Sequence, residues 1–250
     1  MHHTSMIAQA DKLTLQATES IIKLMKPLLA YVECVLFDLD GTLVDTHIDF
    51  ALMKREMIEL ARKAGIDTAE LDGLDILGIA KAAASFVSKA DGAEQGHILY
   101  SQAMSVLEEI ELRHARDTKL VPYAVEAVAA LRERKIGIGV VTRNCRRASE
   151  LSLEIAGITP DVLISREDSL NHKPHPEPIL LALTRLNAQP GNSIMVGDHI
   201  MDMQGGRAAG LKTIGFLRED RADDFFDAVC PDFVARSLRE VVGAIIHTDR

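Results

Sequence analysis

Apolar segments of strand length alternate with helical periodicity through the second half of this chain, and this alternation restricts the fold more than any other feature. The spacing predicts strands at 136–142, 161–165, 193–196 and 211–216, and a short strand near Phe233. It predicts helices at 123–134, 146–156, 176–187 and 200–209, and a last helix at 237–246. Strands that alternate with helices form right-handed β–α–β units. We therefore expect a parallel sheet with helices on both faces.

One further strand precedes this alternating region. The apolar run Val35-Leu36-Phe37 ends in the polar turn Asp38-Leu39-Asp40-Gly41-Thr42, which predicts a buried strand that runs into a turn. Between 46 and 120 the apolar residues recur at helical spacing and no convincing strand appears. The expected fold class is therefore α/β, with a Rossmann-like parallel sheet and an inserted α-helical cap domain.

The expected domain boundaries follow from these two patterns. We predict a leader at 1–34 that contains an amphipathic helix over 14–29, an α/β core made of 35–45 and 121–250, and a helical cap at 46–120.

Polar residues follow the expected strands at the edge of the sheet where ligands bind in open parallel sheets. They are Asp38 and Asp40 after the first strand, Thr142, Arg143 and Asn144 after the second, Lys173 before the helix that follows the third, and Asp198 and Asp202 after the fourth. Taken singly, each has a structural explanation, such as an Asp-x-Asp-Gly turn or a helix cap. Their occurrence together at strand ends indicates a functional site.

Composition excludes several classes of partner. The formal net charge of −9 is the wrong sign for a general nucleic-acid binder or a binder of anionic membranes. The three cysteines, which are few and far apart, form neither a disulfide framework nor a zinc pattern. No apolar run approaches the roughly 20 residues that span a bilayer, and we see no signal peptide. We expect a cytoplasmic protein that acts on a small molecule, whose oligomeric state the sequence does not indicate.

The motifs resemble those of a known family. DLDGT with Asp45 following it, Thr142, Lys173 and GDHIMD resemble the four motifs of the haloacid dehalogenase-like hydrolases, over residues 35–245. The insertion after the first motif resembles that of their helical-cap subfamily, which includes phosphoglycolate phosphatases. This resemblance implies a phosphatase, and it implies that the backbone carbonyl of Asp40 is a metal ligand.

The residues themselves suit phosphoryl transfer, which needs a nucleophile, charge neutralisation and a proton for the leaving group. Asp38 supplies a carboxylate nucleophile that would form an aspartyl-phosphate, and Asp40 is close enough to exchange protons with the leaving group and water. Asp38 and Asp198 would bind Mg²⁺, which prefers a few carboxylate oxygens, water and phosphate. Asp202 lies one helical turn after Asp198 and would act behind the metal ligands.

The phosphoryl group itself needs a cradle of donors. The Thr142 hydroxyl and the N–H groups of Arg143 and Asn144 stand at the start of a helix, where anions bind, and Lys173 adds a point charge. We expect Asp45 to cap the first helix of the inserted domain instead of binding a ligand.

The expected function is a Mg²⁺-dependent phosphatase that hydrolyses a small phosphate monoester, such as a phosphorylated two-carbon acid or a sugar phosphate. Asp40 argues against a dehalogenase or a phosphonatase, because the resemblance implies a different residue there in those relatives. Phosphoglucomutase-type relatives carry a histidine at the position of Phe50, so a mutase is the less favoured alternative. A catalytically silent binding or regulatory protein on the same fold is the other alternative.

Overall fold

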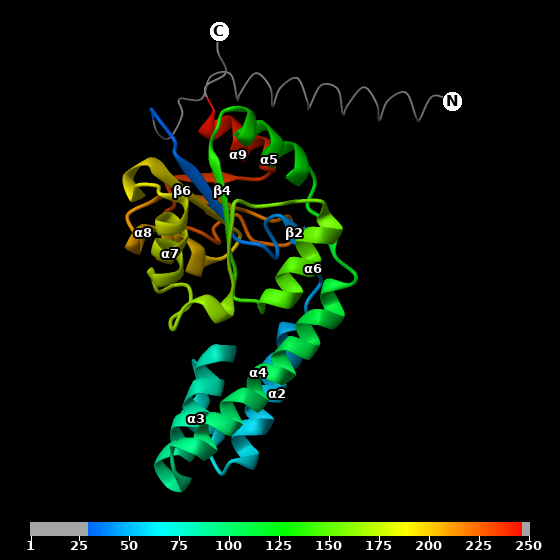
Figure 1. Ribbon diagram of the computed structural model, residues 1–250, viewed down its shortest axis with the longest axis vertical. Coiled ribbons are helices and arrows are strands. Elements are labelled where there is room, and N and C mark those ends of the chain that lie inside the picture. Colours follow the sequence, from blue (N-terminus) through cyan, green and yellow to red (C-terminus); the bar gives the residue numbers. More distant parts are fainter. Residues whose placement is uncertain (1–29, 247–250) are drawn as a thin grey trace, which may run out of the picture. The chain divides into compact units, whose positions relative to one another are not determined.

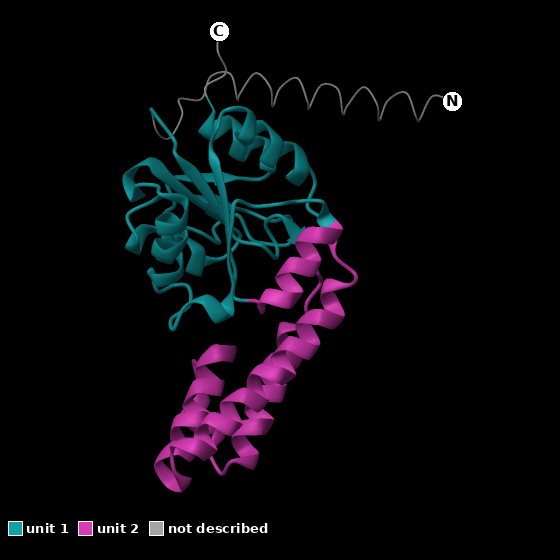
Figure 2. Ribbon diagram, viewed as in Figure 1, with its two compact units in different colours: residues 1–45, 120–143, 156–250 teal, residues 46–119, 144–155 magenta. Residues whose placement is uncertain are grey.

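A computed structural model describes residues 30–246 of the 250-residue chain. The chain divides into two compact units, one made of the described residues of 1–45, 120–143 and 156–250, the other of 46–119 and 144–155 (Figure 2). We call them the α/β unit and the helical unit. The helix expected over 14–29 lies outside the described residues.

The α/β unit is built on a parallel sheet of six strands in the order β5-β4-β1-β6-β7-β8 (Figure 1). The strands are β1 (Cys34–Phe37), β4 (Gly137–Val141), β5 (Val162–Ile164), β6 (Ser193–Gly197), β7 (Lys212–Phe216) and β8 (Phe233–Ala235). Every residue of β1 is fully buried, since this strand pairs with β4 on one side and β6 on the other. The apolar run read from the sequence is thus the centre of the sheet.

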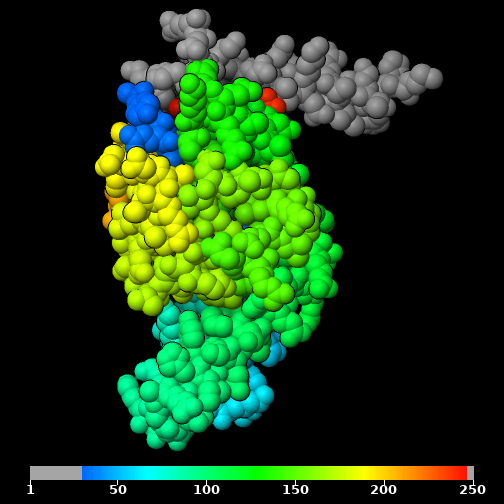
Figure 3. Space-filling view, viewed as in Figure 1, coloured from blue at the N-terminus to red at the C-terminus, as the bar shows by residue number. Residues whose placement is uncertain are grey.

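Helices cover both faces of this sheet. They are α5 (Ala124–Glu133), α7 (Glu177–Leu186), α8 (Ile200–Ala208) and α9 (Leu238–Ile245), with short 3₁₀ turns at Arg166–Asp168 and Pro190–Asn192. Helix α7 shares a buried apolar cluster with β1, in which Ile179 lies with Cys34 and Leu36. The outer side of α7, coloured yellow, is part of the surface seen in Figure 3. Because β–α–β crossovers are right-handed, α7 and α8 lie on one face and α5 on the other, where α5 contacts α9. The predicted fold class is confirmed.

The end of α7 shows how local sequence directs the chain back into the sheet. Asn187 takes the left-handed conformation with φ of 52°, and the N–H of Ala188 donates to the carbonyl of Leu183. Asparagine tolerates this conformation better than most residues, so the helix stops here and the chain turns toward β6.

The helical unit consists of α2 (Phe50–Lys63), the 3₁₀ turn Thr68–Leu71, α3 (Ile76–Asp91), α4 (Ala93–Ala115) and most of α6 (Arg146–Ala156). Its core is apolar and contains Met53, Met57, Ile79, Ala83 and Leu107. No helix between residues 30 and 246 combines the length and apolar character needed to cross a bilayer.

The prediction that Asp45 caps the first inserted helix is wrong. Asp49 caps α2 instead, accepting the N–H of Leu52 at 2.7 Å. The chain is extended through β2 (Val44–Asp45), which pairs with β3 (Lys119–Leu120), and it turns at His47, whose φ is 51°. The helix therefore begins at Phe50, too late for Asp45 to reach its first N–H groups.

Three polar contacts attach α6 to the end of α4 within the helical unit. The buried Glu111 accepts the N–H of Cys145 at 2.8 Å, Arg147 bonds to Glu108 at 2.7 Å, and the Thr118 hydroxyl donates to Ser152 at 3.0 Å. Apolar contacts of Ala115 with Cys145 and Ala148 add to them. These contacts explain why 144–155 groups with this unit, whereas the sequence pattern assigned the segment to the core.

Candidate active site

The residues after β1 and β6 bring two aspartates together in the α/β unit. The N–H of Asp38 donates to the carbonyl of Val196 at 2.9 Å, which extends the parallel pairing by one residue and fixes where the Asp38 side chain starts. Asp198 follows the end of the neighbouring strand β6. Carboxylate oxygens of Asp38, Asp198 and Asp202 all lie within 4.8 Å of one another. The structure thus places these three predicted residues in one cluster.

Lys173 lies in the middle of this cluster and is almost completely buried. Its Nζ donates to Asp38 Oδ1 at 2.6 Å, to Asp202 Oδ1 at 2.7 Å and to the carbonyl of Val141 at 2.7 Å, and its side chain is 2% exposed. An ammonium group has three donors, and all three are used. Burial alone would lower the pKa of Lys173, but the charges of Asp202 and Asp38 raise it above its ordinary value. The group is therefore cationic at neutral pH.

Asp202 uses both of its carboxylate oxygens to hold neighbouring groups of the cluster. One of its oxygens accepts from Lys173, and the other accepts the N–H of His199 at 3.1 Å at the start of α8. A Cβ on Gly197 would lie 2.3 Å from that second oxygen, so the Asp202 side chain needs a glycine at the end of β6. With both oxygens engaged, Asp202 orients Lys173 and the first turn of the helix.

The turn after β1 leaves room for Asp198. Gly41 has a φ of +85°, in the left-handed region that favours glycine, and its N–H donates to the carbonyl of Val44 at 2.7 Å. A Cβ on Gly41 would lie only 2.2 Å from Asp198 Oδ2. The glycine of the DLDGT motif is therefore required by the approach of a carboxylate as well as by the turn.

The electrostatics of the cluster fit a divalent cation. Burial raises the pKa of Asp198 to about 8, with the charges of Asp38 and Asp202 adding to the rise. Burial also raises the pKa of Asp38, and Asp202 adds to it while Lys173 opposes it. Close carboxylates that repel one another are stabilised by a cation between them, and Mg²⁺ prefers such oxygen ligands. Asp38 and Asp198 have carboxylate oxygens that could hold the cation. Both oxygens of Asp202 already accept hydrogen bonds, one from Lys173 and one from the His199 N–H.

The other predicted residues lie as follows. Thr142 is buried and its N–H donates to the carbonyl of Ile164 at 2.9 Å, so it directly continues β4. Arg143 follows it and is half-buried, with Nη1 3.2 Å from Met201 Sδ. Asp40 is half-buried at the bridge it forms with Val44.

Asn144 differs from these residues, because it begins the segment 144–155 of the helical unit. Its role in binding a phosphoryl group stays a prediction.

Sequence reasoning missed Arg218. This residue follows β7, and its Nη2 lies 3.0 Å from Asp45 Oδ2, while its Nε lies 3.3 Å from Asp220 Oδ1. Its positive charge also acts on Asp198, where it opposes the rise in pKa. The rule that located the other residues would have found it: the strand expected at 211–216 also has a charged residue just past its carboxyl end.

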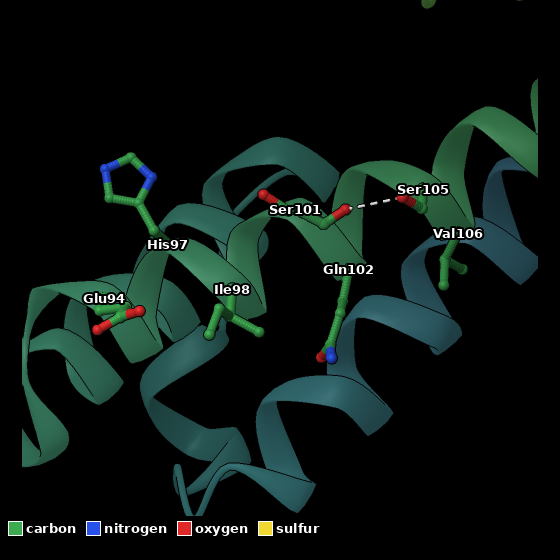
Figure 4. Close-up of a pocket in the computed structure, with 7 residues that line it drawn as sticks. All are labelled: Glu94, His97, Ile98, Ser101, Gln102, Ser105 and Val106. Carbon is green, nitrogen blue, oxygen red and sulfur yellow. Dashed lines mark hydrogen bonds between the residues drawn. The ribbon is translucent and has the colours of Figure 1, made fainter.

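A surface groove on the helical unit offers a different kind of site. It has a volume of about 600 Å³ and runs along α4, whose side chains line it (Figure 4). Its lining has one carboxylate, Glu94, and one imidazole, His97, beside Ile98 and Val106. Among residues 30–246, the cluster of carboxylates that could hold a metal ion is that of Asp38, Asp198 and Asp202 in the α/β unit, and none of these residues lines the groove.

Comparison with known proteins agrees with this geometry. Residues 35–216 match the haloacid dehalogenase-like hydrolase family. A curated relative, pyrophosphatase PpaX of Halalkalibacterium halodurans, is 30% identical over 222 residues, which cover 86% of this chain and 97% of the relative.

Two solved structures share the fold. A predicted phosphoglycolate phosphatase from Haemophilus somnus is 18% identical with a TM-score of 0.58, and it covers 84% of this chain and 96% of its own. The hydrolase YfnB of Bacillus subtilis, solved with bound magnesium, is 18% identical with a TM-score of 0.55, and it covers 84% of this chain and 97% of its own.

The chain belongs to the haloacid dehalogenase-like hydrolases. The predicted family and the predicted enzyme class, a phosphatase of this superfamily, are both confirmed.

Proposed function

We propose that this phosphatase requires Mg²⁺ and hydrolyses a small phosphate monoester, phosphoglycolate-like or a sugar phosphate, through an aspartyl-phosphate on Asp38. The observation that carries the proposal is the buried network in which Lys173 bonds to both Asp38 and Asp202 beside Asp198. It combines a nucleophile, a fixed positive charge and a pair of carboxylates for a cation.

The reaction would proceed in two displacements at phosphorus. In the first, a carboxylate oxygen of Asp38 bonds to phosphorus, the bond from phosphorus to the leaving oxygen breaks, and Asp40 gives that oxygen a proton. In the second, water attacks the aspartyl-phosphate, Asp40 takes a proton from it, and the bond from phosphorus to Asp38 breaks. Inorganic phosphate leaves and both carboxyl groups regain their starting states.

The surrounding groups hold the phosphoryl oxygens. Lys173 supplies a charge fixed by Asp202, and the Thr142 hydroxyl with the N–H groups of Arg143 and Asn144 would supply neutral donors. Mg²⁺, bound by Asp38, Asp198 and the backbone carbonyl of Asp40, would neutralise charge on the transferred group. Burial of the cluster strengthens each of these interactions.

The comparisons support a small phosphorylated substrate and leave the compound open. The relative from Halalkalibacterium halodurans is named a pyrophosphatase, and a structural neighbour is named a predicted phosphoglycolate phosphatase. Phe50, 56% exposed at the start of α2, has no group that transfers a proton, which disfavours the mutase alternative. We also propose that the protein acts in the cytoplasm.

The test uses the full chain with p-nitrophenyl phosphate as a general substrate. We expect phosphate release that needs Mg²⁺, stops on chelation and returns when Mg²⁺ is restored. Asp38→Asn should lower kcat by at least about 10⁴-fold, the order seen when a nucleophile is removed. Asp91→Asn, at the exposed end of α3, is the matched control and should leave the rate unchanged. Turnover that survives in Asp38→Asn, or under exhaustive chelation, would contradict the proposal.

A further inference from the structure

A row of contacting side chains borders the candidate active site within the α/β unit. Arg143 Nη1 lies 3.2 Å from Met201 Sδ, and the N–H of Met201 donates to His199 Nδ1 at 3.2 Å. The His199 ring meets the Phe225 ring edge-on with centroids 6.3 Å apart, and the Arg221 guanidinium lies 4.9 Å from the Phe225 centroid. We call Arg143, His199 and Arg221 the rim donors: the two guanidinium groups are cationic, and the neutral His199 ring accepts at Nδ1 and keeps an N–H donor at Nε2.

Two of the rim donors are adjacent in the chain to residues that would carry the reaction. Arg143 follows Thr142, and His199 follows Asp198 and donates its N–H to Asp202. Burial lowers the pKa of His199, the charge of Asp38 opposes this, and the charges of Arg221 and Arg143 lower the pKa further. His199 therefore lies within electrostatic range of Asp38 and of both arginines.

Arg221 is held in place without a carboxylate. Among residues 30–246 its guanidinium stacks on Phe225 and makes no hydrogen bond or ion pair. Its neighbours differ, because Arg218 pairs with Asp45 and Asp220, and Arg236 pairs with Asp223. Stacking on an aromatic ring positions a guanidinium and leaves its N–H donors open to an incoming anion.

The transferred phosphoryl group does not need the rim donors. Lys173, backbone donors and the carboxylates that would hold Mg²⁺ already provide for it. In a chain with 37 acidic and 28 basic residues, two arginines and a histidine gathered at one site are an excess of donors for anions. Guanidinium groups suit carboxylates and phosphates, which they bind through paired hydrogen bonds.

We propose that the substrate carries a second anionic group beside the transferred phosphoryl group, and that Arg143, His199 and Arg221 bind it. This inference rests on the proposed function. It favours phosphorylated carboxylic acids over sugar phosphates within that substrate class and extends the class to diphosphates. Its residues all belong to the α/β unit, so it needs no contribution from the helical unit.

The test compares compounds that differ in the second group. With Mg²⁺ and the full chain, kcat/KM is measured for 2-phosphoglycolate, for inorganic pyrophosphate and for 2-hydroxyethyl phosphate, in which a neutral hydroxyl replaces the anion. We expect at least one anionic compound to exceed 2-hydroxyethyl phosphate by about tenfold or more, mainly through a lower KM. A higher kcat/KM for 2-phosphoglycolate identifies the second anionic group as a carboxylate, and a higher kcat/KM for inorganic pyrophosphate identifies it as a phosphate.

Variants of the two arginines then assign the preference to the rim donors. Arg221→Gln should reduce the preference ratio by about tenfold, and Arg221→Lys should restore part of it because the charge returns. Arg143→Gln should reduce the ratio as well. Arg239→Gln is the matched control, since Arg239 also stacks on an aromatic ring, that of Tyr123, 4.6 Å from its centroid. The control should keep the wild-type ratio.

The outcomes separate this inference from the proposed function. Mg²⁺-dependent release from all three compounds at similar kcat/KM, or a ratio that Arg221→Gln leaves unchanged, would overturn the inference and leave the phosphatase standing. Release from none of them, nor from p-nitrophenyl phosphate, would overturn both.

Discussion

The two units of this chain treat charge in opposite ways. The α/β unit buries an ammonium group against carboxylates, and the Lys173 side chain is 2% exposed. The helical unit keeps its ion pairs at the surface, as in Glu59 with Arg62, whose side chains are 41% and 62% exposed. Its interior is apolar apart from the buried Glu111, which accepts a backbone N–H. Buried charges are costly unless they are paired, and clusters of this kind mark functional sites. The contrast locates the chemistry without any reference to relatives.

The largest effect is expected where the buried charges meet. Lys173→Met keeps an unbranched apolar side chain one atom shorter and leaves Asp38 and Asp202 without their shared cation. Breaking a buried pair in this way costs about 3–5 kcal/mol. We expect a clear fall in the free energy of unfolding, measured with urea in the presence of a chelator. Arg62→Met removes a surface pair and should cause no measurable change. Equal losses in the two variants would remove the distinction between the units.

The second prediction concerns the apolar core of the helical unit. Leu107 is fully buried in α4, and Leu107→Ala should cost about 3 kcal/mol, because a cavity remains where the side chain was removed. The Mg²⁺ affinity, measured by calorimetry, should stay within about twofold of wild type. A change in affinity as large as that of Asp198→Asn would show that the two units are not energetically separate.

A smaller effect is expected at the ion pair between Arg218 and Asp45. Both side chains are 27% exposed, so the pair is neither buried nor free in solvent. A double-mutant cycle with Arg218→Gln and Asp45→Asn should give a coupling energy of about 1 kcal/mol in urea unfolding. Coupling near zero would place this pair with the surface pairs of the helical unit.

The smallest effect is a dependence of stability on pH at the start of β8. Burial raises the pKa of Asp232, but bonds from Lys212 at 2.6 Å and from the N–H of Thr213 at 2.9 Å outweigh it, and the folded-state pKa is lowered. The stabilisation is therefore complete above the ordinary carboxyl pKa of about 3.9 and is lost as pH falls through the lowered value.

Asp232→Asn tests this directly. The variant should be less stable than wild type by under about 1 kcal/mol at neutral pH, since solvent screens the pair. The difference should shrink in acid, as followed by urea unfolding across pH. If the difference in unfolding free energy between wild type and Asp232→Asn grows as pH falls, the pKa of Asp232 is not lowered in the folded state.

Periodicity predicted most of the fold, because apolar spacing records which face of each element is buried. The helix expected at 146–156 is α6, and the strand expected at 136–142 is β4 at Gly137–Val141. The strands β2 and β3 have two residues each, too few to show a period, and they were not expected.

The site was predictable where a local motif carries it and less so where distant parts of the chain meet. Asp38, Asp198 and Asp202 are gathered as the strand-end rule expects, because β1 and β6 are neighbours. Asp45 pairs with Arg218, which lies 173 residues later in the chain. Local sequence spacing does not predict an ion pair between residues so far apart. Asp49 caps the helix because β2 includes Asp45 and α2 begins only at Phe50.

The central position of β1 has a consequence for how the chain folds during its synthesis. Its neighbours β4 and β6 are made about 100 and 160 residues later, so both edges of this apolar strand stay unpaired while the helices of 46–119 emerge. Unpaired apolar strands invite association with other chains, and contacts between distant residues form slowly. We therefore expect the nascent chain to be most prone to association with other chains between the appearance of Phe37 and that of Gly197.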